Sequence, residues 1–228
     1  MGIMSADRGV WLEDLTWQEA KVRFDAGAVV VVPVGAASKA HGPHLPLKTD
    51  ALTARALAQN LVERLPIVAA PVVGFGFYPA FTAFAGSQHL TADTFKALMR
   101  ELVGNLRGHG VRRIAILNTG VSTEKPLDEL SGELGEIAVL HMRLFGAKAD
   151  ALFDDLEGGH ADERETSVML ALEPRSVRMD RLIPEGDFKT TAATGDASRA
   201  SAFKGERLVD ARAEDMAAAL VARWPDAF

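Results

Sequence analysis

The sequence contains no cysteine and no long apolar run, and each absence excludes several kinds of protein. Without cysteine there can be no disulfide, thiolate nucleophile, cysteine-ligated zinc or iron–sulfur cluster. Any metal ion must therefore bind through histidine, aspartate or glutamate. No stretch approaches the roughly 18 consecutive apolar residues of a membrane-spanning helix. The first residues also lack the apolar centre of a signal peptide, so a cytoplasmic location is the default, with an exported form left open if the N-terminus is trimmed.

The charge balance shows no basic excess. The chain has 25 lysines and arginines against 31 aspartates and glutamates, a formal net charge of -6. Nucleic acids and anionic lipids are bound mainly by clustered lysine and arginine, so we predict neither a nucleic-acid nor a membrane partner. With 48% apolar and 25% charged residues, the composition is that of a globular protein. The length favours one domain over residues 1–228.

Apolar periodicity alternates between helix-like and strand-like segments, which is typical of an α/β protein. The expected strands cover residues 28–34, 67–73, 111–117 and 136–142. The expected helices cover residues 16–26, 50–65, 92–108, 126–134, 161–172 and 211–223, and a small-residue loop covers 190–201. In open α/β sheets, ligands bind beyond the carboxyl ends of the strands. Candidate site residues are therefore sought directly after each strand.

The segment after the first strand, residues 35–50, reads GAASKAHGPHLPLKTD. His41, His44 and Asp50 are competent ligands for a borderline divalent cation such as Zn²⁺, Mn²⁺ or Co²⁺. Asp50 could equally cap the following helix, and a histidine in a rigid loop often bonds to backbone. Taken alone, these three residues favour the structural interpretation.

A second cluster, EGGHADERETS, covers residues 157–167. His160 precedes a helix whose first turns carry Asp162, Glu163 and Glu165. Acidic residues in a first turn are favoured by the helix dipole without any function. His160 is the stronger candidate, because a histidine flanked by carboxylates can act as a general acid or base or as a metal ligand.

A third segment, residues 74–86, is rich in phenyl rings and includes Phe75, Tyr78 and Phe84. Aromatic residues this dense in a loop indicate a pocket wall or a subunit contact, although packing in the core explains them about as well. The segment lacks the third glycine of a dinucleotide fingerprint, and the chain has neither a Walker A motif nor a G-x-S-x-G elbow.

The chain resembles the creatininase (creatinine amidohydrolase) family, whose pattern ends H-G-P-H-L-P-x-x-T/N-D. Residues 41–50, HGPHLPLKTD, reproduce this pattern in full. Further matches are FAGS at 84–87, HGVRR at 109–113, HADERETS at 160–167 and ASAFKGERL at 200–208. The resemblance implies a creatininase-like three-layer α/β sandwich around a mostly parallel sheet, assembled as a homo-oligomer, typically a hexamer.

The resemblance also implies metal-dependent hydrolysis of an amide or cyclic amide C–N bond at a dinuclear Zn²⁺ or Mn²⁺ site. His41 and Asp50 match two ligands, with Asp50 as the bridging one. The other ligands differ: Ser38-Lys39-Ala40 stands where the family has its first Glu, and Gly120 and Ser122 replace two more. Losing three of five ligands removes most of the negative charge that holds two dications together. We therefore expect one ion or none.

Two arrangements could replace the dinuclear centre. One is a mononuclear site of His41, Asp50 and a carboxylate or imidazole from the His160 cluster. The other is Lys39 in the place of a cation. By resemblance the family's catalytic histidine matches His160, and the acid three positions before it matches Glu157.

The first prediction is thus a metal-dependent amidohydrolase that acts on a small molecule. Phe75, Tyr78 and Phe84 are predicted to line its substrate-binding pocket. The alternative is not an enzyme: a catalytically silent family member that acts as a small-molecule-binding or assembly protein. A third possibility is a metal-free hydrolase that uses His160 with Glu163.

Overall fold

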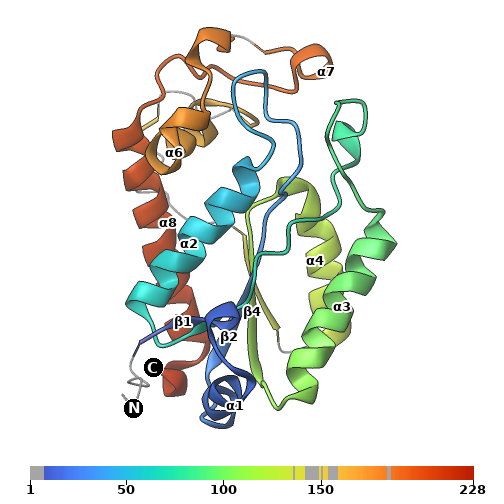
Figure 1. Ribbon diagram of the computed structural model, residues 1–228, viewed down its shortest axis with the longest axis vertical. Helices are drawn as coiled ribbons and strands as arrows, with labels where there is room; N and C mark the ends of the chain where they lie inside the picture. Colours follow the sequence, from blue (N-terminus) through green and yellow to red (C-terminus); the bar gives the residue numbers. More distant parts are fainter. Residues whose placement is uncertain (1–7, 136, 142–148, 150, 154–158, 184–185) are drawn as a thin grey trace.

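A computed structural model describes residues 8–135, 137–141, 149, 151–153, 159–183 and 186–228. It has three layers, in which a sheet lies between two layers of helices (Figure 1). The five described strands follow the order β1-β3-β2-β4-β5, and every pair is parallel. The strands are β1 (Val10–Trp11), β2 (Val29–Val34), β3 (Val68–Ala69), β4 (Arg113–Asn118) and β5 (Ile137–His141). The predicted α/β class with a parallel sheet is confirmed.

The helices divide between the two faces of the sheet. Helices α2 (Thr49–Arg64), α6 (Glu163–Leu172) and α8 (Ala202–Arg223) cover one face. Helices α1 (Trp17–Asp25), α3 (Ala92–Gly108) and α4 (Val121–Leu134) cover the other, and the short α7 (Phe188–Thr191) lies in the loops beyond the sheet. Among the described residues, no helix is both long and apolar enough to cross a membrane.

Strand β2 is buried on both faces, which explains its unbroken apolar sequence. Because successive side chains point to opposite faces, Val29 and Val31 pack under α2 and α8, whereas Val30 and Val32 pack under α3 and α4. Strands β2 and β4 stay paired to their last residues, Val34 and Asn118. The loops that follow these two strands therefore start side by side.

Helices α6 and α8 meet at a close backbone contact. A Cβ atom added to Gly205 in α8 would lie 2.0 Å from the carbonyl oxygen of Ser167 in α6. No residue larger than glycine fits this crossing without moving one of the two helices. The contact fixes where α6 lies against the rest of the layer.

Three boundaries differ from the sequence predictions by more than two residues. The strand expected over 67–73 pairs regularly only at Val68–Ala69, because Pro71 has no amide proton for the ladder. Helix α4 begins at Val121 and contains Pro126, whereas the sequence predicts that the helix starts at Pro126. Helix α8 begins at Ala202 instead of 211, because the Ser201 side chain caps it by accepting from the Lys204 amide.

Candidate functional site

The loop between β2 and α2 brings three polar side chains together at the carboxyl edge of the sheet. The backbone amide of Lys39 donates to the Leu47 carbonyl at 3.0 Å, so the loop folds back on itself. The amide of Ala51 then donates to the Ala36 carbonyl at 3.2 Å. These bonds place Lys39 and His41 beside Asp50, which lies in the first turn of α2.

Asp50 is buried and contacts a cationic group through one oxygen and an imidazole through the other. Its Oδ2 lies 2.6 Å from Lys39 Nζ, and its Oδ1 lies 2.9 Å from His41 Nε2. Burial by itself raises the pKa of this carboxyl, but the charges of Lys39 and His41 outweigh burial and hold the pKa well below its usual range. Asp50 is therefore a carboxylate at every pH at which the protein would work.

His41 is fully buried, and both of its ring nitrogens face oxygen atoms. Nδ1 lies 2.8 Å from the Lys39 carbonyl oxygen, and Nε2 lies 2.9 Å from Asp50 Oδ1. Both oxygens are hydrogen-bond acceptors. The ring must therefore donate a proton to each oxygen, or share its Asp50 side with a cation.

His160 reaches the same place from the loop before α6. Its Nε2 donates to the Ala40 carbonyl at 2.7 Å, which leaves Nδ1 without the proton. Nδ1 lies 3.5 Å from Glu165 Oε2, too far for a hydrogen bond of normal length. The rings of His160 and His41 are 4.5 Å apart between centroids. Burial, with the charges of His41 and Lys39, lowers the pKa of His160 to about 2, so the imidazole is neutral.

The start of α6 directs Glu165 toward His160. Asp162 caps the helix by accepting from the amides of Arg164 and Glu165 at 3.0 and 2.9 Å. The Glu165 side chain folds back so that Oε2 accepts from the Ala161 amide at 2.5 Å. Ala161 has a φ of 51°, an unusual value for a residue with a Cβ, and this tight turn brings His160 and Glu165 to the same side. Burial, and then the charge of Glu165, raises the pKa of Asp162 to about 6.

His41, His160 and Glu165 offer three ligand atoms that all lie within 4.8 Å of one another. Within the described part of the chain, this is the one group of histidines and carboxylates with that spacing. Two imidazoles and a carboxylate are a donor set that Zn²⁺ and Mn²⁺ accept. The lone pair of His160 Nδ1 also faces the Glu165 carboxylate, an arrangement that a cation between them would stabilise. One divalent cation fits.

A second ion at Asp50 does not fit. The Lys39 ammonium already contacts Oδ2, the carboxylate oxygen that a second ion would need. A unit positive charge about 4 Å from a dication costs on the order of 8 kcal/mol at an effective dielectric constant of about 20. Lys39 therefore takes the position on Asp50 that the second ion of a dinuclear centre would need.

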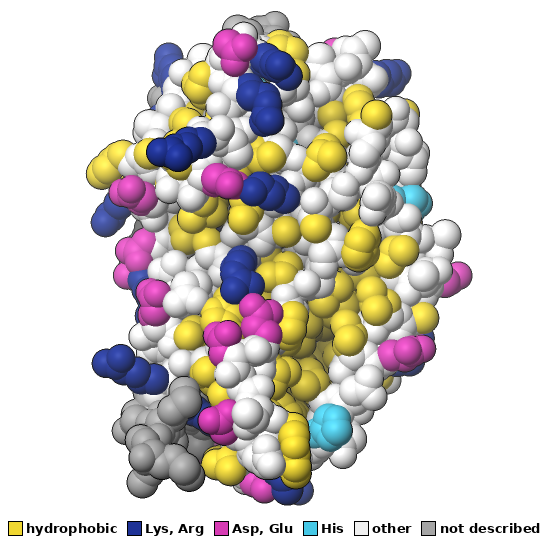
Figure 2. Space-filling view, viewed as in Figure 1, with side chains coloured by type: hydrophobic (Ala, Val, Ile, Leu, Met, Phe, Trp, Pro, Cys, Tyr) yellow, Lys and Arg dark blue, Asp and Glu magenta, His cyan; other side chains and the backbone are white. Residues whose placement is uncertain are grey.

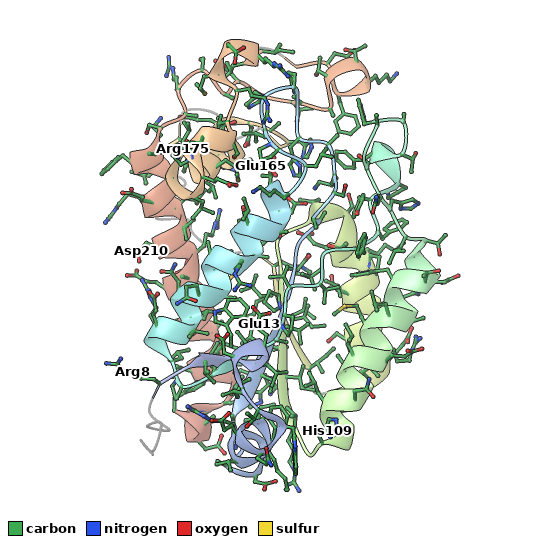
Figure 3. All side chains as sticks on the ribbon, in the orientation of Figure 1. Arg8, Glu13, His109, Glu165, Arg175 and Asp210 are labelled. Atoms are coloured by element: carbon green, nitrogen blue, oxygen red, sulfur yellow. The ribbon has the colours of Figure 1, made fainter. Side chains whose placement is uncertain are left out.

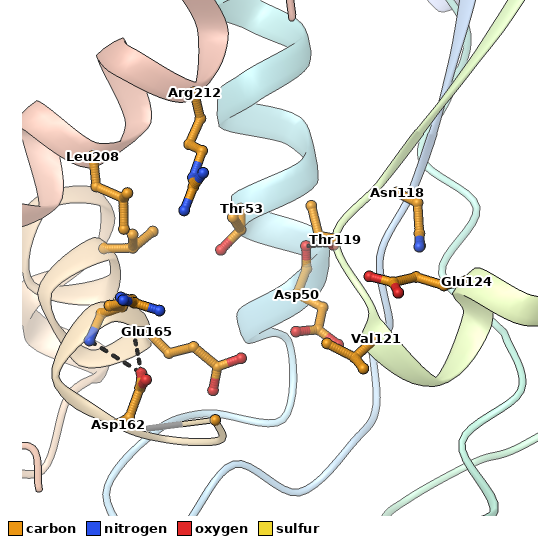
Figure 4. A pocket seen from close by; sticks show the side chains of 13 residues that line it. Asp50, Thr53, Asn118, Thr119, Val121, Glu124, Asp162, Glu165, Leu208 and Arg212 are labelled. Atoms are coloured by element: carbon orange, nitrogen blue, oxygen red, sulfur yellow. Dashed lines mark hydrogen bonds between the residues drawn. The ribbon is translucent and has the colours of Figure 1, made fainter. Parts of the chain in front are cut away.

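A cavity of about 320 Å³ opens beside these residues (Figure 4). Asp50 and Glu165 point into it from α2 and α6, and Glu124 and Arg212 approach from α4 and α8. Figure 3 shows Glu165 near one end of the molecule and His109 near the other, so His109 is remote from this cavity. The volume of the cavity suits a small molecule, and the residues that line the cavity include both negative and positive side chains.

The acid beside His160 is Glu165, whereas sequence reasoning selected Glu163 and Glu157. Glu163 is buried and its carboxylate pairs with Lys204 Nζ of α8. Glu157 lies outside the described residues. The signal that could have identified Glu165 is its position three residues after the capping Asp162, since a glutamate there often folds back over the helix start.

The predicted aromatic wall lies close to the site. Phe75, which is 48% exposed, and the buried Tyr78 line a small second cavity together with Lys39 and Asp50. The Tyr78 hydroxyl donates to the Gln88 carbonyl. Phe84 packs edge-on against Phe188, with 5.9 Å between ring centroids. Substrate contact by Phe75, Tyr78 and Phe84 stays a prediction.

The loop after β4 is held by structural hydrogen bonds. Asn118 Oδ1 accepts from the Gly120 amide at 3.2 Å and from the Thr123 hydroxyl at 2.7 Å. Its amide nitrogen lies 3.1 Å from Nδ1 of His141, whose Nε2 lies 3.0 Å from Asp128 Oδ1. These contacts fix the start of α4 and direct Glu124 toward the larger cavity.

Comparison with known proteins identifies the class. The creatininase family, described as creatinine amidohydrolase, matches residues 13–220. Creatinine amidohydrolase of Pseudomonas putida is 26% identical in an alignment 259 residues long, and this alignment covers 96% of this chain and 98% of that protein. Mycofactocin precursor peptide peptidase of Mycobacterium tuberculosis is 30% identical over 226 residues, which cover 86% of this chain and 85% of that protein.

A solved structure, creatininase Mn, superposes with a TM-score of 0.85 at 24% identity and covers 96% of this chain and 100% of its own. The fold is thus that of the creatininases. The family consists of metal-dependent amide hydrolases, as the resemblance implied. This chain belongs to the creatininase family.

Proposed function

We propose that this protein hydrolyses an amide C–N bond in a small molecule and uses one divalent cation held by His41, His160 and Glu165. The observation that carries the proposal is the convergence of these three ligand atoms within 4.8 Å beside a cavity of about 320 Å³. The names of the two relatives, an amidohydrolase and a peptidase, support amide cleavage. The donor set favours Zn²⁺ or Mn²⁺, and the related creatininase structure is named for Mn.

When bound, the cation would polarise the amide carbonyl and make a water molecule more acidic. The chain's own residues then have separate tasks. The Ala40 carbonyl accepts the His160 Nε2 proton, so that Nδ1 carries the lone pair that would hold the cation. Glu165 keeps Oε2 on the Ala161 amide and presents its other oxygen to the cavity. From there it can take a proton from water and return it to the leaving nitrogen.

The lining of the cavity limits the substrate. Glu124 and Arg212 bring opposite charges to its wall, together with the hydroxyl of Thr53. A small polar molecule with both donors and acceptors matches this lining better than a purely apolar one. The aromatic residues Phe75 and Tyr78 lie at the separate, smaller cavity, so their contact with substrate would need a ligand that reaches past Asp50.

Metal analysis tests the proposal most directly. Protein purified without chelator and reconstituted with Mn²⁺ or Zn²⁺ should hold about one ion per chain. His41→Ala and Glu165→Gln should lose it, whereas the matched control Glu163→Gln should keep it. Hydrolysis of a panel of small amides and lactams should stop with EDTA and return with metal. Absence of metal under every condition, or hydrolysis indifferent to EDTA, would overturn the proposal. Metal binding without hydrolysis would instead favour the binding-protein alternative.

A homo-oligomer is also part of the proposal. Figure 2 shows hydrophobic side chains gathered over the surface between α2 and α3. Trp17 of α1 is 73% exposed, a high value for a large apolar residue. A second copy of the chain would cover such surface. Native mass spectrometry should detect a multimer, and a monomer at every concentration would contradict this part.

A further inference from the structure

Lys39 is a buried residue inside the candidate site. Its side chain is only 7% exposed, and its Nζ lies 2.6 Å from Asp50 Oδ2 and 4.9 Å from the centroid of the Phe81 ring. Its backbone carbonyl accepts from the His41 ring at 2.8 Å. Lysine is among the residues least often buried, so a lysine in this position calls for a physical reason.

Stability alone does not supply that reason. Taking an ammonium and a carboxylate out of water costs about as much as their attraction returns, and apolar residues of similar volume often serve a core equally well. The pair also has a neighbour that an ordinary ion pair does not need, because His41 Nε2 contacts the second oxygen of the same carboxylate. Asp50 therefore contacts one group with each oxygen, as a carboxylate does when it bridges two metal ions.

We propose that Lys39 is a covalently attached cation that occupies the place of a second metal ion on Asp50. The presence of a first ion beside His41 rests on the proposed function, whereas the role of Lys39 at Asp50 does not. The ammonium holds one oxygen of Asp50, and the other oxygen of Asp50 contacts His41, which lies beside His160 and Glu165. Lys39 is thus a positioning residue, and it limits the chain to one dication.

The inference predicts that a reversal of charge at Lys39 creates an ion site. In Lys39→Glu a second carboxylate would face Asp50 with the His41 imidazole beside both, a set of donors that binds divalent cations. Without an ion, the two buried carboxylates would repel each other. The variant should therefore bind one more Mn²⁺ per chain than the wild type, and added Mn²⁺ should raise its melting temperature by several degrees more.

The chain offers a matched control. Lys204 and Glu163 form a second lysine–carboxylate pair with a buried acid, but this pair lies outside the group of His41, His160 and Glu165. Lys204→Glu should therefore change stability and leave the number of bound ions as it is in the wild type. An extra ion in both variants would show that any pair of buried acids collects metal, which would overturn the specific role of Lys39.

A second variant covers the case in which Lys39→Glu does not fold. Lys39→Ala removes the ammonium and leaves space beside Asp50, so millimolar ethylammonium or Mn²⁺ should raise its melting temperature, with sodium chloride of equal ionic strength as the reference. No additional ion in a folded Lys39→Glu, or no rescue of Lys39→Ala if Lys39→Glu fails to fold, would overturn the inference.

The two proposals fail in different ways. A wild type without metal, combined with one ion in Lys39→Glu, would overturn the single-metal site and support the role of Lys39. A wild type with one ion, combined with one ion in Lys39→Glu, would support the proposed function and overturn the role of Lys39. Elemental analysis of the two proteins separates these outcomes without any assay of activity.

Discussion

The two lysine–carboxylate pairs of this protein look alike and differ in their surroundings. In both pairs the acid is almost fully buried: the side chain of Asp50 is 5% exposed and that of Glu163 is 1% exposed. Lys39 is 7% exposed, whereas Lys204 is 21% exposed and lies 5.9 Å from the centroid of the Phe153 ring. The Asp50 pair contacts His41 of the candidate site, and the Glu163 pair joins α6 to α8.

Burial and charge do not by themselves mark a functional pair. What distinguishes the Asp50 pair is that its carboxylate also contacts an imidazole, at the edge of the sheet where ligands bind in this kind of fold. Changes near the first pair should thus alter metal binding and hydrolysis, whereas changes to the second should alter only stability.

The sharpest test of this difference is His160→Ala. The loss of a ligand and of its hydrogen bond to Ala40 should lower kcat/KM at least about 100-fold, the low end of what a positioned catalytic group contributes. Steady-state kinetics on an amide found in the substrate panel measures the effect. Lys204→Met should keep the wild-type rate under the same conditions. Equal losses in both variants would remove the distinction between the pairs.

The next largest effect is expected for Asp50→Ala. The substitution leaves the Lys39 ammonium buried without its carboxylate, which should lower the free energy of unfolding by about 3–5 kcal/mol. Urea denaturation measures this loss. The double variant Asp50→Leu with Lys39→Met should recover much of it, because no unpaired charge remains. If the double variant is as unstable as the single one, the loss comes from packing.

Lys204→Met should have a smaller effect. Glu163 would lose a charged partner, but the partly exposed Lys204 is already screened by water, so we expect a loss of about 1–3 kcal/mol in the free energy of unfolding. The bound metal, measured by elemental analysis on the same sample, should not change. A lower metal content here would mean that the second pair also supports the site.

The smallest effect concerns pH and His44, which lies in the loop of the first pair. Burial, and then the charge of His41, lowers its pKa below the ordinary value of 6.5. The unfolded chain therefore binds the proton more tightly, so this contribution to stability is present above pH 6.5 and is lost as pH falls through the folded-state pKa. His44→Gln can keep the bond to Thr166, 2.8 Å in the wild type, and should flatten the fall in stability below pH 6.5. Urea unfolding at several pH values measures how the free energy of unfolding depends on pH. The same dependence in His44→Gln and in the wild type would contradict this prediction.

Local sequence patterns predicted most of the fold. The run of valines in β2 and the helix expected over 16–26, which begins with a capping box at Thr16, needed no knowledge of distant residues. The errors arose at Pro71, Pro126 and Ser201, where a single residue ends, interrupts or caps an element against the apolar periodicity. Such boundaries depend on individual hydrogen bonds, which periodicity does not record.

The site was predictable where its residues lie close together in sequence. His41 and Asp50 belong to one continuous motif, and the structure places them in contact. The distinction between Glu163 and Glu165 was not accessible, because it depends on the turn at Ala161 and on Lys204, which lies 41 residues beyond Glu163. A pattern of acids on a helix cannot show which of them a distant lysine binds.

Gly205, at the crossing of α6 and α8, affects the site without contacting it, because it sets the position of α6. Glu165 lies two residues before Ser167, whose carbonyl leaves no space for a side chain at Gly205. In a random mutagenesis screen for lost hydrolysis, Gly205 substitutions should therefore be recovered alongside those of the metal ligands. The same constraint makes the start of the last helix a poor position for labels or engineered surface residues.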